Sequence, residues 1–320
     1  MSEMNVLKLK LDKIITYIVD KDDVIFVDYP VYHNVGDLLI FRGTLELLSE
    51  HNVKIKAFRS VIDYNYDDIK NYVTPSTTIL CQGGGNFGDI YPAHQQLRES
   101  VVEHFPKNRI IVLPQTAYFS SEQNFQKSLL KLNKHQDLIL FARDQNTLNI
   151  FDKLTTKALL SPDMAHALYG KLKKSEHKNH GVLYFLRADC EINEFQKRIT
   201  FPAGTQSKDW SDFITIKDRL YRRFISYMFF ISNKLNSAKF KDLTAYLWRN
   251  HCNKLVSRSF VYFSQFNEIV TSRMHGHILA CLVDVPNKVI DNSYGKNSGY
   301  FNEWTRTVPT SSLFDAEKEK

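Results

Sequence analysis

Three residues that can bind an anion or move a proton lie close together between Ile269 and Pro286: Arg273, His275 and His277. An arginine guanidinium matches carboxylate or phosphate oxygens, and an imidazole can hold or release a proton near neutral pH. An apolar run precedes them and apolar residues at helical spacing follow, which predicts a strand, a tight turn and a helix. A helix N-terminus favours an anion, so the stretch predicts an anion site with an acid or base in it. The alternative is that each residue is a helix cap or lies on the surface.

A second strand-to-helix turn carries Asn34, Gly36 and Asp37, between a strand predicted at 23–28 and a helix that ends near residue 48. The glycine permits a sharp bend or close approach, and Asn or Asp can cap the helix or bind hydroxyl groups. Capping explains Asp37 better than Asn34.

Further polar residues end predicted strands in the first half of the chain. The strand at 77–82 continues into Gly83-Gly84-Gly85-Asn86 and on to Asp89, which predicts a loop close to a ligand, although it fits neither a Walker loop nor GxGxxG. Gln115 ends the strand at 109–115. Arg143 and Asp144 follow an apolar strand and precede a helix predicted at 145–154.

Length and composition indicate a folded protein, with 43% hydrophobic residues in a chain of 320. No apolar run approaches the roughly 20 residues that span a bilayer, and the first residues lack a signal-peptide core, so a cytoplasmic protein is expected. The four cysteines are far apart, which predicts buried, reduced thiols rather than disulfides or a zinc site. The net charge of +7 comes from scattered residues without a nucleic-acid-binding signature, so a small acidic substrate is favoured and nucleic acid is not.

Strands alternate with helices along most of the chain, which predicts an α/β fold with a doubly wound parallel sheet. The first helix is expected from Met4 to Val19, and a charged stretch at 170–181 indicates a linker between domains at 1–172 and 178–320. A strand beginning at Val182 is followed by polar residues that can belong to a loop of the second domain, namely Arg187, Asp189 and Glu191.

The segment from about 213 to 260 is rich in aromatic and basic residues. Such a helical segment can rest on a membrane surface or a partner, or simply pack with its long cations extended to water. Lys296 follows a strand predicted at 288–291 and can return to the turn of Arg273 and His275.

The ordered set of these motifs closely resembles the polysaccharide pyruvyl transferase family over about residues 28–304. No single motif decides this, but their order does. The matching motifs are Asn34-Val-Gly-Asp37, Gly83-Gly-Gly-Asn-Phe-Gly-Asp89, Ala142-Arg-Asp144, Ser161-Pro-Asp163, Ser272-Arg-Met-His-Gly-His277 and Tyr294-Gly-Lys296.

The resemblance implies two Rossmann-like domains in a GT-B-like arrangement, with the active site in the cleft between them. The N-terminal domain is expected on the acceptor side and the C-terminal domain on the donor side. The implied reaction moves a pyruvyl group from phosphoenolpyruvate to a sugar of an exopolysaccharide or cell-surface polysaccharide precursor and leaves a pyruvate ketal. The acceptor can be a sugar or a lipid-linked oligosaccharide. Phosphoenolpyruvate is the donor substrate, and no metal or cofactor is expected.

The resemblance also assigns roles to individual residues. It implies that His275 is the general acid and that Arg143, Arg273 and Lys296 bind phosphoenolpyruvate. Asp37 and Asp89 are both open as the base. The remaining expected substrate-binding residues lie inside the matching motifs: Asn34, Gly84, Gly85, Asn86 and Met274.

Two other functions stay open. One is a GT-B-type glycosyltransferase that holds the pyrophosphate of a nucleotide sugar with Arg143, Arg273 and His275. The other is a non-catalytic subunit of polysaccharide assembly that contacts the inner face of the membrane peripherally through residues 221–248. A shared fold alone does not establish transfer.

Overall fold

The computed structural model of the protein describes residues 1–176, 179–188, 192, 196, 207–291 and 295–314. Four residues discussed above lie outside these ranges: Asp189, Cys190, Glu191 and Tyr294. The other three cysteines are buried free thiols, as the sequence predicts.

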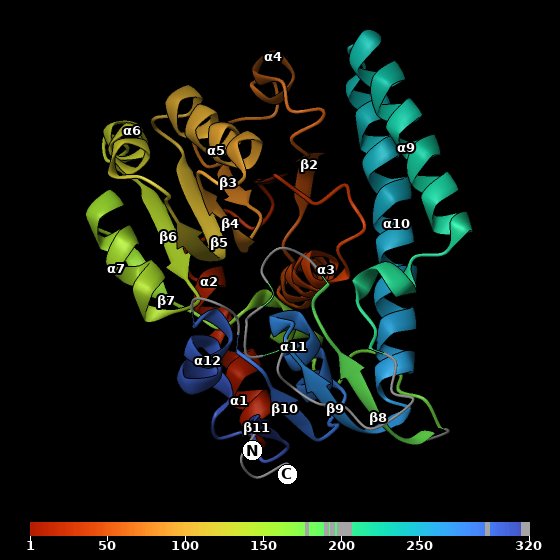
Figure 1. Ribbon diagram of the computed structural model, residues 1–320. Coiled ribbons are helices and arrows are strands. Elements are labelled where there is room, and N and C mark those ends of the chain that lie inside the picture. Colours follow the sequence, from red (N-terminus) through yellow and green to blue (C-terminus); the bar gives the residue numbers. More distant parts are fainter. Residues whose placement is uncertain (177–178, 189–191, 193–195, 197–206, 292–294, 315–320) are drawn as a thin grey trace.

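Seven parallel strands form the first sheet, in the half of the molecule coloured red to yellow-green in Figure 1. The strand order is β2-β1-β3-β5-β6-β7, and β4 pairs with the carboxyl end of β5. The chain therefore winds in opposite directions on the two sides of β1, and ligands bind at the carboxyl ends of the strands beside such a switch point. The strands are β1 (Val24–Val27), β2 (Ile55–Arg59), β3 (Thr78–Cys81), β4 (Gly84–Gly88), β5 (Arg109–Tyr118), β6 (Leu138–Ala142) and β7 (Ala158–Leu160).

Continuous apolar runs form the central strands because helices cover both faces of this sheet. Alternate residues point to opposite faces, so Ile25 and Val27 pack with α5–α7, whereas Val24 and Phe26 pack on the side of α1 and α3. The helices of this half are α1 (Glu3–Lys10), α2 (Asp12–Ile15), α3 (Val35–Glu50), α4 (Tyr66–Ile69), α5 (Pro92–His104), α6 (Glu122–Leu132), α7 (Gln145–Leu154) and the 3₁₀ helix η1 (Met164–Leu168).

A second parallel sheet has the order β11-β10-β9-β8 and occupies the lower part of Figure 1. Its strands are β8 (Asn179–Phe185), β9 (Phe266–Thr271), β10 (Asn287–Val289) and β11 (Ser311–Leu313). The predicted strand, turn and helix around Arg273 are confirmed, because β9 leads into α11 (Met274–Leu282).

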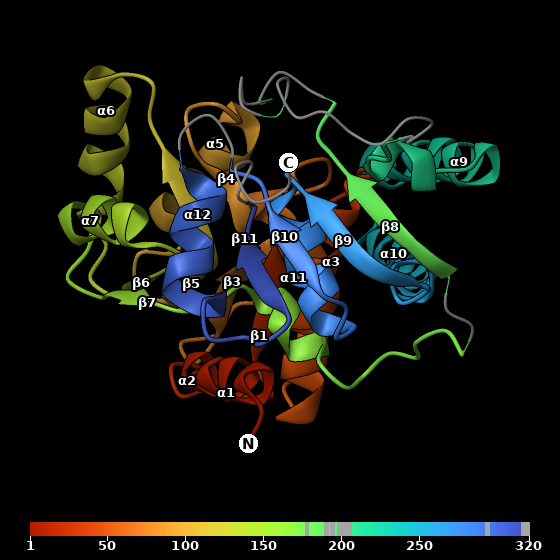
Figure 2. The same cartoon turned by 60° about the horizontal axis from the view of Figure 1, so that its bottom comes forward.

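The basic aromatic segment forms a helical hairpin at the edge of the molecule (Figures 1 and 2). The 3₁₀ helix η2 (Trp210–Phe213) leads into α9 (Ile216–Lys234), and α9 packs along α10 (Ala238–Phe263). Two contacts fix α10 to the first sheet: the Trp248 indole donates to the carbonyl of Pro30 at 2.6 Å, and Asp242 pairs with buried Arg59 at 2.7 Å.

One hydrophobic core joins both sheets. Phe141 of β6, Leu38 of α3, Trp248 of α10 and Ile278 of α11 belong to the same buried cluster. The chain also returns to the first sheet after β10, through α12 (Lys296–Tyr300) and the π-helix η3 (Phe301–Thr305).

The prediction of parallel α/β layers is confirmed, whereas two local predictions were wrong. The first helix is interrupted at Leu11, whose N–H donates to the carbonyl of Lys8 at 3.1 Å rather than to that of Leu7, as a regular α-helix requires. The helical part ends at Ile15. The glycine-rich stretch expected as a loop forms β4, because its backbone pairs with β5. Among the described residues, no helix is both long enough and apolar enough to cross a membrane.

Candidate active site

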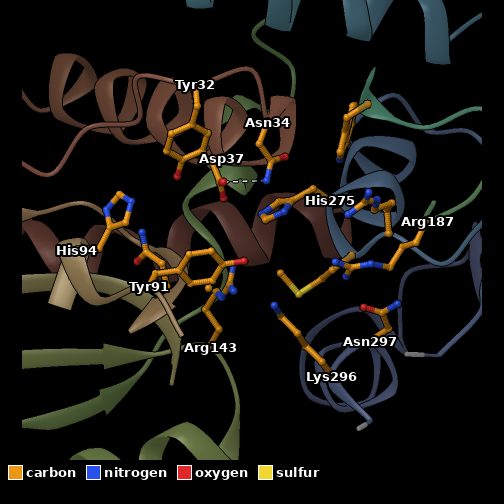
Figure 3. A pocket seen from close by; sticks show the side chains of 15 residues that line it. Tyr32, Asn34, Asp37, Tyr91, His94, Arg143, Arg187, His275, Lys296 and Asn297 are labelled. Carbon is orange, nitrogen blue, oxygen red and sulfur yellow. Dashed lines mark hydrogen bonds between the residues drawn. The ribbon is translucent and has the colours of Figure 1, made fainter. Parts of the chain in front are cut away.

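A cavity of about 400 Å³ lies at the carboxyl ends of strands from both sheets (Figure 3). The first sheet contributes side chains that follow β1, β3 and β6, and the second contributes side chains that follow β8, β9 and β10. The lining residues are Tyr32, Asn34, Asp37, Gly85, Asn86, Tyr91, His94, Arg143, Arg187, Trp210, Arg273, Met274, His275, Lys296 and Asn297.

A buried carboxylate links the cavity arginine of the first sheet to the cavity histidine of the second. Asp163 Oδ2 accepts from Arg143 Nη1 at 2.5 Å and lies 3.3 Å from His275 Nε2. Burial raises the pKa of Asp163, but the charges of His275 and Arg143 and the hydrogen bonds outweigh it and hold this pKa well below its usual range. Asp163 is therefore an ionised acceptor that orients the His275 ring.

Positive charge converges on the cavity from both sheets. A Cβ added to Gly85 would lie 2.9 Å from Lys296 Nζ and 3.4 Å from Arg143 Nη2, so both cationic groups approach the same backbone position. Arg273 is held by Asp209, with Nε donating to Oδ1 at 2.8 Å and Nη2 to Oδ2 at 2.5 Å. Arg187 completes the set of lining cations. Such a group suits a ligand with two separate anionic groups.

Asn34 and Asp37 lie at the N-terminus of α3. The sequence favoured Asp37 over Asn34 as the residue that caps this helix, and the structure shows the reverse. Asn34 is the N-cap, since its Oδ1 accepts from the Gly36 N–H at 3.1 Å, and its Nδ2 donates to Asp37 Oδ2 at 2.8 Å. Burial raises the pKa of the neighbouring Tyr32 well above its ordinary value, and the carboxylates of Asp37 and Asp28 add to this rise.

Asp89, the other candidate base, is not among the cavity-lining residues. Its carboxylate accepts from Ser120 and Asn124, next to the start of α6. The structure thus brings Asp37 to the cavity and leaves Asp89 at a structural position.

The glycine-rich strand β4 places its residues differently. Gly85 and Asn86 line the cavity, whereas Gly84 is not among the lining residues and a Cβ there would be 3.7 Å from Asp37 Oδ1. Asn86 is held by Gln115, whose Nε2 donates to its Oδ1 at 3.1 Å, and by Arg98. Gln115 therefore supports the site from behind.

His277 does not join Arg273 and His275 at the cavity. It is buried between Asn287 Oδ1 at 2.6 Å and Thr305 Oγ1 at 2.7 Å. Burial lowers the pKa of His277 to about 4. It is a neutral histidine that ties α11 to β10 and η3.

A second histidine, which the sequence patterns did not single out, faces the cavity from α5 (Figure 3). His94 Nδ1 lies 2.5 Å from Oδ1 of buried Asp28, and Asp28 Oδ2 accepts from buried Arg98 at 2.9 Å. Asp28 directly follows β1 in a left-handed conformation with φ of 68°, which costs free energy for a non-glycine residue. Asp28, a polar residue directly after an apolar strand, was the feature of the sequence that could have indicated this cluster of His94, Asp28 and Arg98.

Three aromatic side chains and Asn297 also lie at the cavity without having been predicted. Tyr32 and Tyr91 both meet His94 edge-on, and Trp210 also lines the cavity. Asn297 is buried and its Nδ2 donates to the carbonyls of Ser272 and Ile290, which fixes α12 against the turn of Arg273. Among the described residues, no group of three or more His, Cys, Asp or Glu side chains could hold a metal ion.

Fold and cavity together define an α/β protein with a cation-lined site between two parallel sheets. A family model described as "Polysaccharide pyruvyl transferase" matches residues 34–294, and the chain belongs to this family. It is 34% identical over 319 residues to "Putative pyruvyl transferase EpsO" of Bacillus subtilis (strain 168), covering 98% of this chain and 95% of that protein.

A further relative supports the family, and a solved structure supports the fold alone. "Pyruvyl transferase 1" of Schizosaccharomyces pombe (strain 972 / ATCC 24843) is 25% identical over 298 residues, which cover 88% of this chain and 69% of that protein. The crystal structure of an uncharacterized protein from Klebsiella pneumoniae subsp. pneumoniae NTUH-K2044 superposes with a TM-score of 0.60 at 18% identity, covering 97% of this chain and 99% of that one.

Proposed function

We propose that the protein transfers a pyruvyl group from phosphoenolpyruvate to two hydroxyl groups of a sugar and forms a pyruvate ketal. The observation that carries this proposal is the convergence of His275 with four cations, Arg143, Arg187, Arg273 and Lys296, on one cavity. Phosphoenolpyruvate has a carboxylate and a phosphate, so it needs at least two cationic anchors. Membership in the family supports the same reaction class.

In the proposed reaction, His275 donates a proton to the methylene carbon of phosphoenolpyruvate. The adjacent carbon becomes cation-like, and the oxygen of a sugar hydroxyl attacks it and gives up its proton to a base. The C–O bond to phosphate then breaks, and a second hydroxyl forms the other bond of the ketal as its proton passes to the departing phosphate. An imidazolium ion is suited to the first step near neutral pH.

Two groups at the cavity can accept the proton of the first hydroxyl. Asp37 lies at the N-terminus of α3, and His94 is oriented by Asp28 at 2.5 Å. In Figure 3 both lie on the side of the cavity formed by the first sheet. This position supports an acceptor bound on the side of the first sheet and a donor held mainly by cations of the second sheet, with Arg143 reaching the donor from the first.

We infer that the acceptor is a sugar or lipid-linked oligosaccharide of a polysaccharide precursor, as the family's description implies. Tyr32, Tyr91 and Trp210 supply ring surfaces at the cavity for the apolar faces of a sugar. The proposal includes domains at 1–172 and 178–320 in a GT-B-like arrangement, catalysis in the cytoplasm, and a peripheral contact with the inner face of the membrane.

Ligand binding tests the donor. Thermal unfolding is followed with phosphoenolpyruvate, uridine diphosphate or guanosine diphosphate, for the native protein, Arg273→Ala and the exposed-site control Arg306→Ala. A ligand that binds the folded state raises its apparent stability. We expect stabilisation by phosphoenolpyruvate that Arg273→Ala loses and Arg306→Ala keeps. Stabilisation by a nucleotide instead would indicate a glycosyltransferase, and phosphate release measured with a sugar acceptor separates an active enzyme from a non-catalytic subunit.

A further inference from the structure

The outer face of α9 exposes a row of large apolar side chains that no other described part of the chain covers. Five residues, spaced three or four apart, lie on the side of α9 opposite the residues packed on α10, and each is 46–75% exposed: Ile216, Leu220, Phe224, Tyr227 and Phe230. Figure 2 shows α9 at the periphery of the molecule, with α10 beneath it. A contiguous apolar row of this kind marks an interaction surface.

Cations border this row on the same face. Lys217, Arg219, Arg223 and Lys234 are all exposed. The sole acidic residue of α9, Asp218, is buried and caps the helix through Thr215. The whole hairpin region 213–260 has ten lysines and arginines against two aspartates. The surface therefore combines apolar side chains with a positive potential, which fits an anionic partner that also has an apolar interior.

We propose that this face of α9 docks the protein on a bilayer surface that carries anionic lipid. Interfacial helices of this type bury aromatic and aliphatic side chains at the boundary of headgroups and acyl chains, while lysines and arginines contact anionic headgroups. A second copy of the chain fits the face less well, because a two-fold contact through α9 would bring the same four cations against each other.

Docking at α9 would hold the cavity close to the bilayer. Trp210 lines the cavity, and α9 begins six residues later, at Ile216. The hairpin is fixed to the loop that carries Tyr32 and Asn34, because Trp248 donates to Pro30 at 2.6 Å and Arg222 Nε donates to the carbonyl of Val31 at 3.3 Å. A membrane-bound hairpin would thus position the site rigidly for an acceptor at the membrane surface. This consequence rests on the proposed reaction. The docking itself does not depend on that reaction and gives the proposed peripheral membrane contact a defined surface.

Flotation with lipid vesicles tests the proposal on the full-length protein. The vesicles contain phosphatidylcholine alone or phosphatidylcholine with phosphatidylglycerol. One double variant reverses charge, Arg219→Glu with Arg223→Glu, and another removes apolar surface, Phe224→Ser with Phe230→Ser. The matched control is Lys127→Glu with Leu130→Ser on exposed positions of α6, on the far side of the molecule in Figure 1.

We expect the native protein and the α6 control to float with the anionic vesicles. Each α9 variant should lose at least about tenfold in partitioning. The charge-reversed variant loses about 1 kcal/mol for each cation near such a surface, and the phenylalanine variant loses the burial of two aromatic side chains, at about 25 cal/mol per Å². Added salt should weaken binding of the native protein. Thermal unfolding of each variant checks that it folds.

No flotation of the native protein, equal flotation of the α9 variants, or equal binding to both vesicle types would overturn the proposal. Concentration-dependent dimers that the phenylalanine variant loses, without vesicle binding, would assign the face to self-association instead. Phosphate release has no part in this readout, so failure of the proposed reaction would be seen separately.

Discussion

The backbone of Gly36 lies directly against the imidazole of His275. A Cβ added at Gly36 would be 2.8 Å from Nδ1 and 3.0 Å from both Cβ and Cγ of His275. The N-terminus of α3, which follows β1 of the first sheet, and the start of α11, which follows β9 of the second, thus meet without room for a methyl group. Together with Asp163 at 3.3 Å from Nε2, this contact fixes the ring on two sides.

Gly36→Ala should therefore lower kcat by displacing His275. A displacement on the order of 1 Å can cost roughly 10²-fold in rate, and overpacking costs about 1–3 kcal/mol of stability. Steady-state phosphate release and thermal unfolding measure both effects. Gly299→Ala is the control, because a Cβ there meets nothing within 4 Å. Full activity of Gly36→Ala would show that the position of His275 is not critical.

Asp163 should contribute to stability and to catalysis in separable ways. Asp163→Ala leaves the guanidinium of buried Arg143 without its carboxylate, which should cost about 3–5 kcal/mol. Asp163→Asn keeps the shape and an acceptor oxygen, so it should lose less stability but still lower kcat, because the ring of His275 loses a charged partner. Urea unfolding and phosphate release measure the two. Asp67→Asn, at an exposed pair with Lys70, should change stability by less than about 1 kcal/mol. Equal stability of Asp163→Ala and the native protein would contradict a stabilising role for the Asp163–Arg143 pair.

The sequence predicted the parts of the site that follow strands directly. Arg143, Arg273 and His275 were found because a polar residue after an apolar run marks the carboxyl end of a strand. The helix predicted at 145–154 agrees with α7. Asp163, in contrast, was quoted in a motif without a role, because its contacts with Arg143 and His275 span 20 and 112 residues.

Tertiary packing decided what local patterns could not. Neighbouring His275 and His277 had the same appearance in sequence, but their places on α11 direct one to the cavity and the other into the core. His94 sits within an ordinary amphipathic helix, and only the fold brings it to Asp28, 66 residues earlier.

His94→Gln should lower kcat if His94 accepts the hydroxyl proton. General base catalysis contributes about 10²–10⁴-fold, whereas the KM for phosphoenolpyruvate should change little because its cationic anchors remain. His104→Gln is a matched control on the same helix, stacked on Tyr66 at 4.4 Å. Loss of activity in Asp37→Asn with full activity in His94→Gln would assign the base to Asp37.

Acidification should destabilise the fold through its buried neutral histidines. Burial, first among the causes, lowers the pKa of both His277 and His166 to about 4, from an ordinary 6.5. Between these values the unfolded chain binds protons that the folded protein does not. The free energy of unfolding therefore falls as the pH is lowered from about 6.5 towards 4, by up to about 1.4 kcal/mol per pH unit for each histidine. Asp63 acts in the opposite sense, because burial raises its pKa to about 6 and the folded state keeps its proton more tightly.

Urea unfolding of native protein and His277→Gln at a series of pH values measures this dependence. The variant should be less stable at neutral pH, because Asn287 and Thr305 lose their partner. Its stability should also fall less steeply with acidification, because one of the titrating histidines is gone. Loss of stability alone would follow from any poorly packed substitution, so the shallower slope is the decisive result. An unchanged slope would mean that His277 is not held neutral in the folded protein.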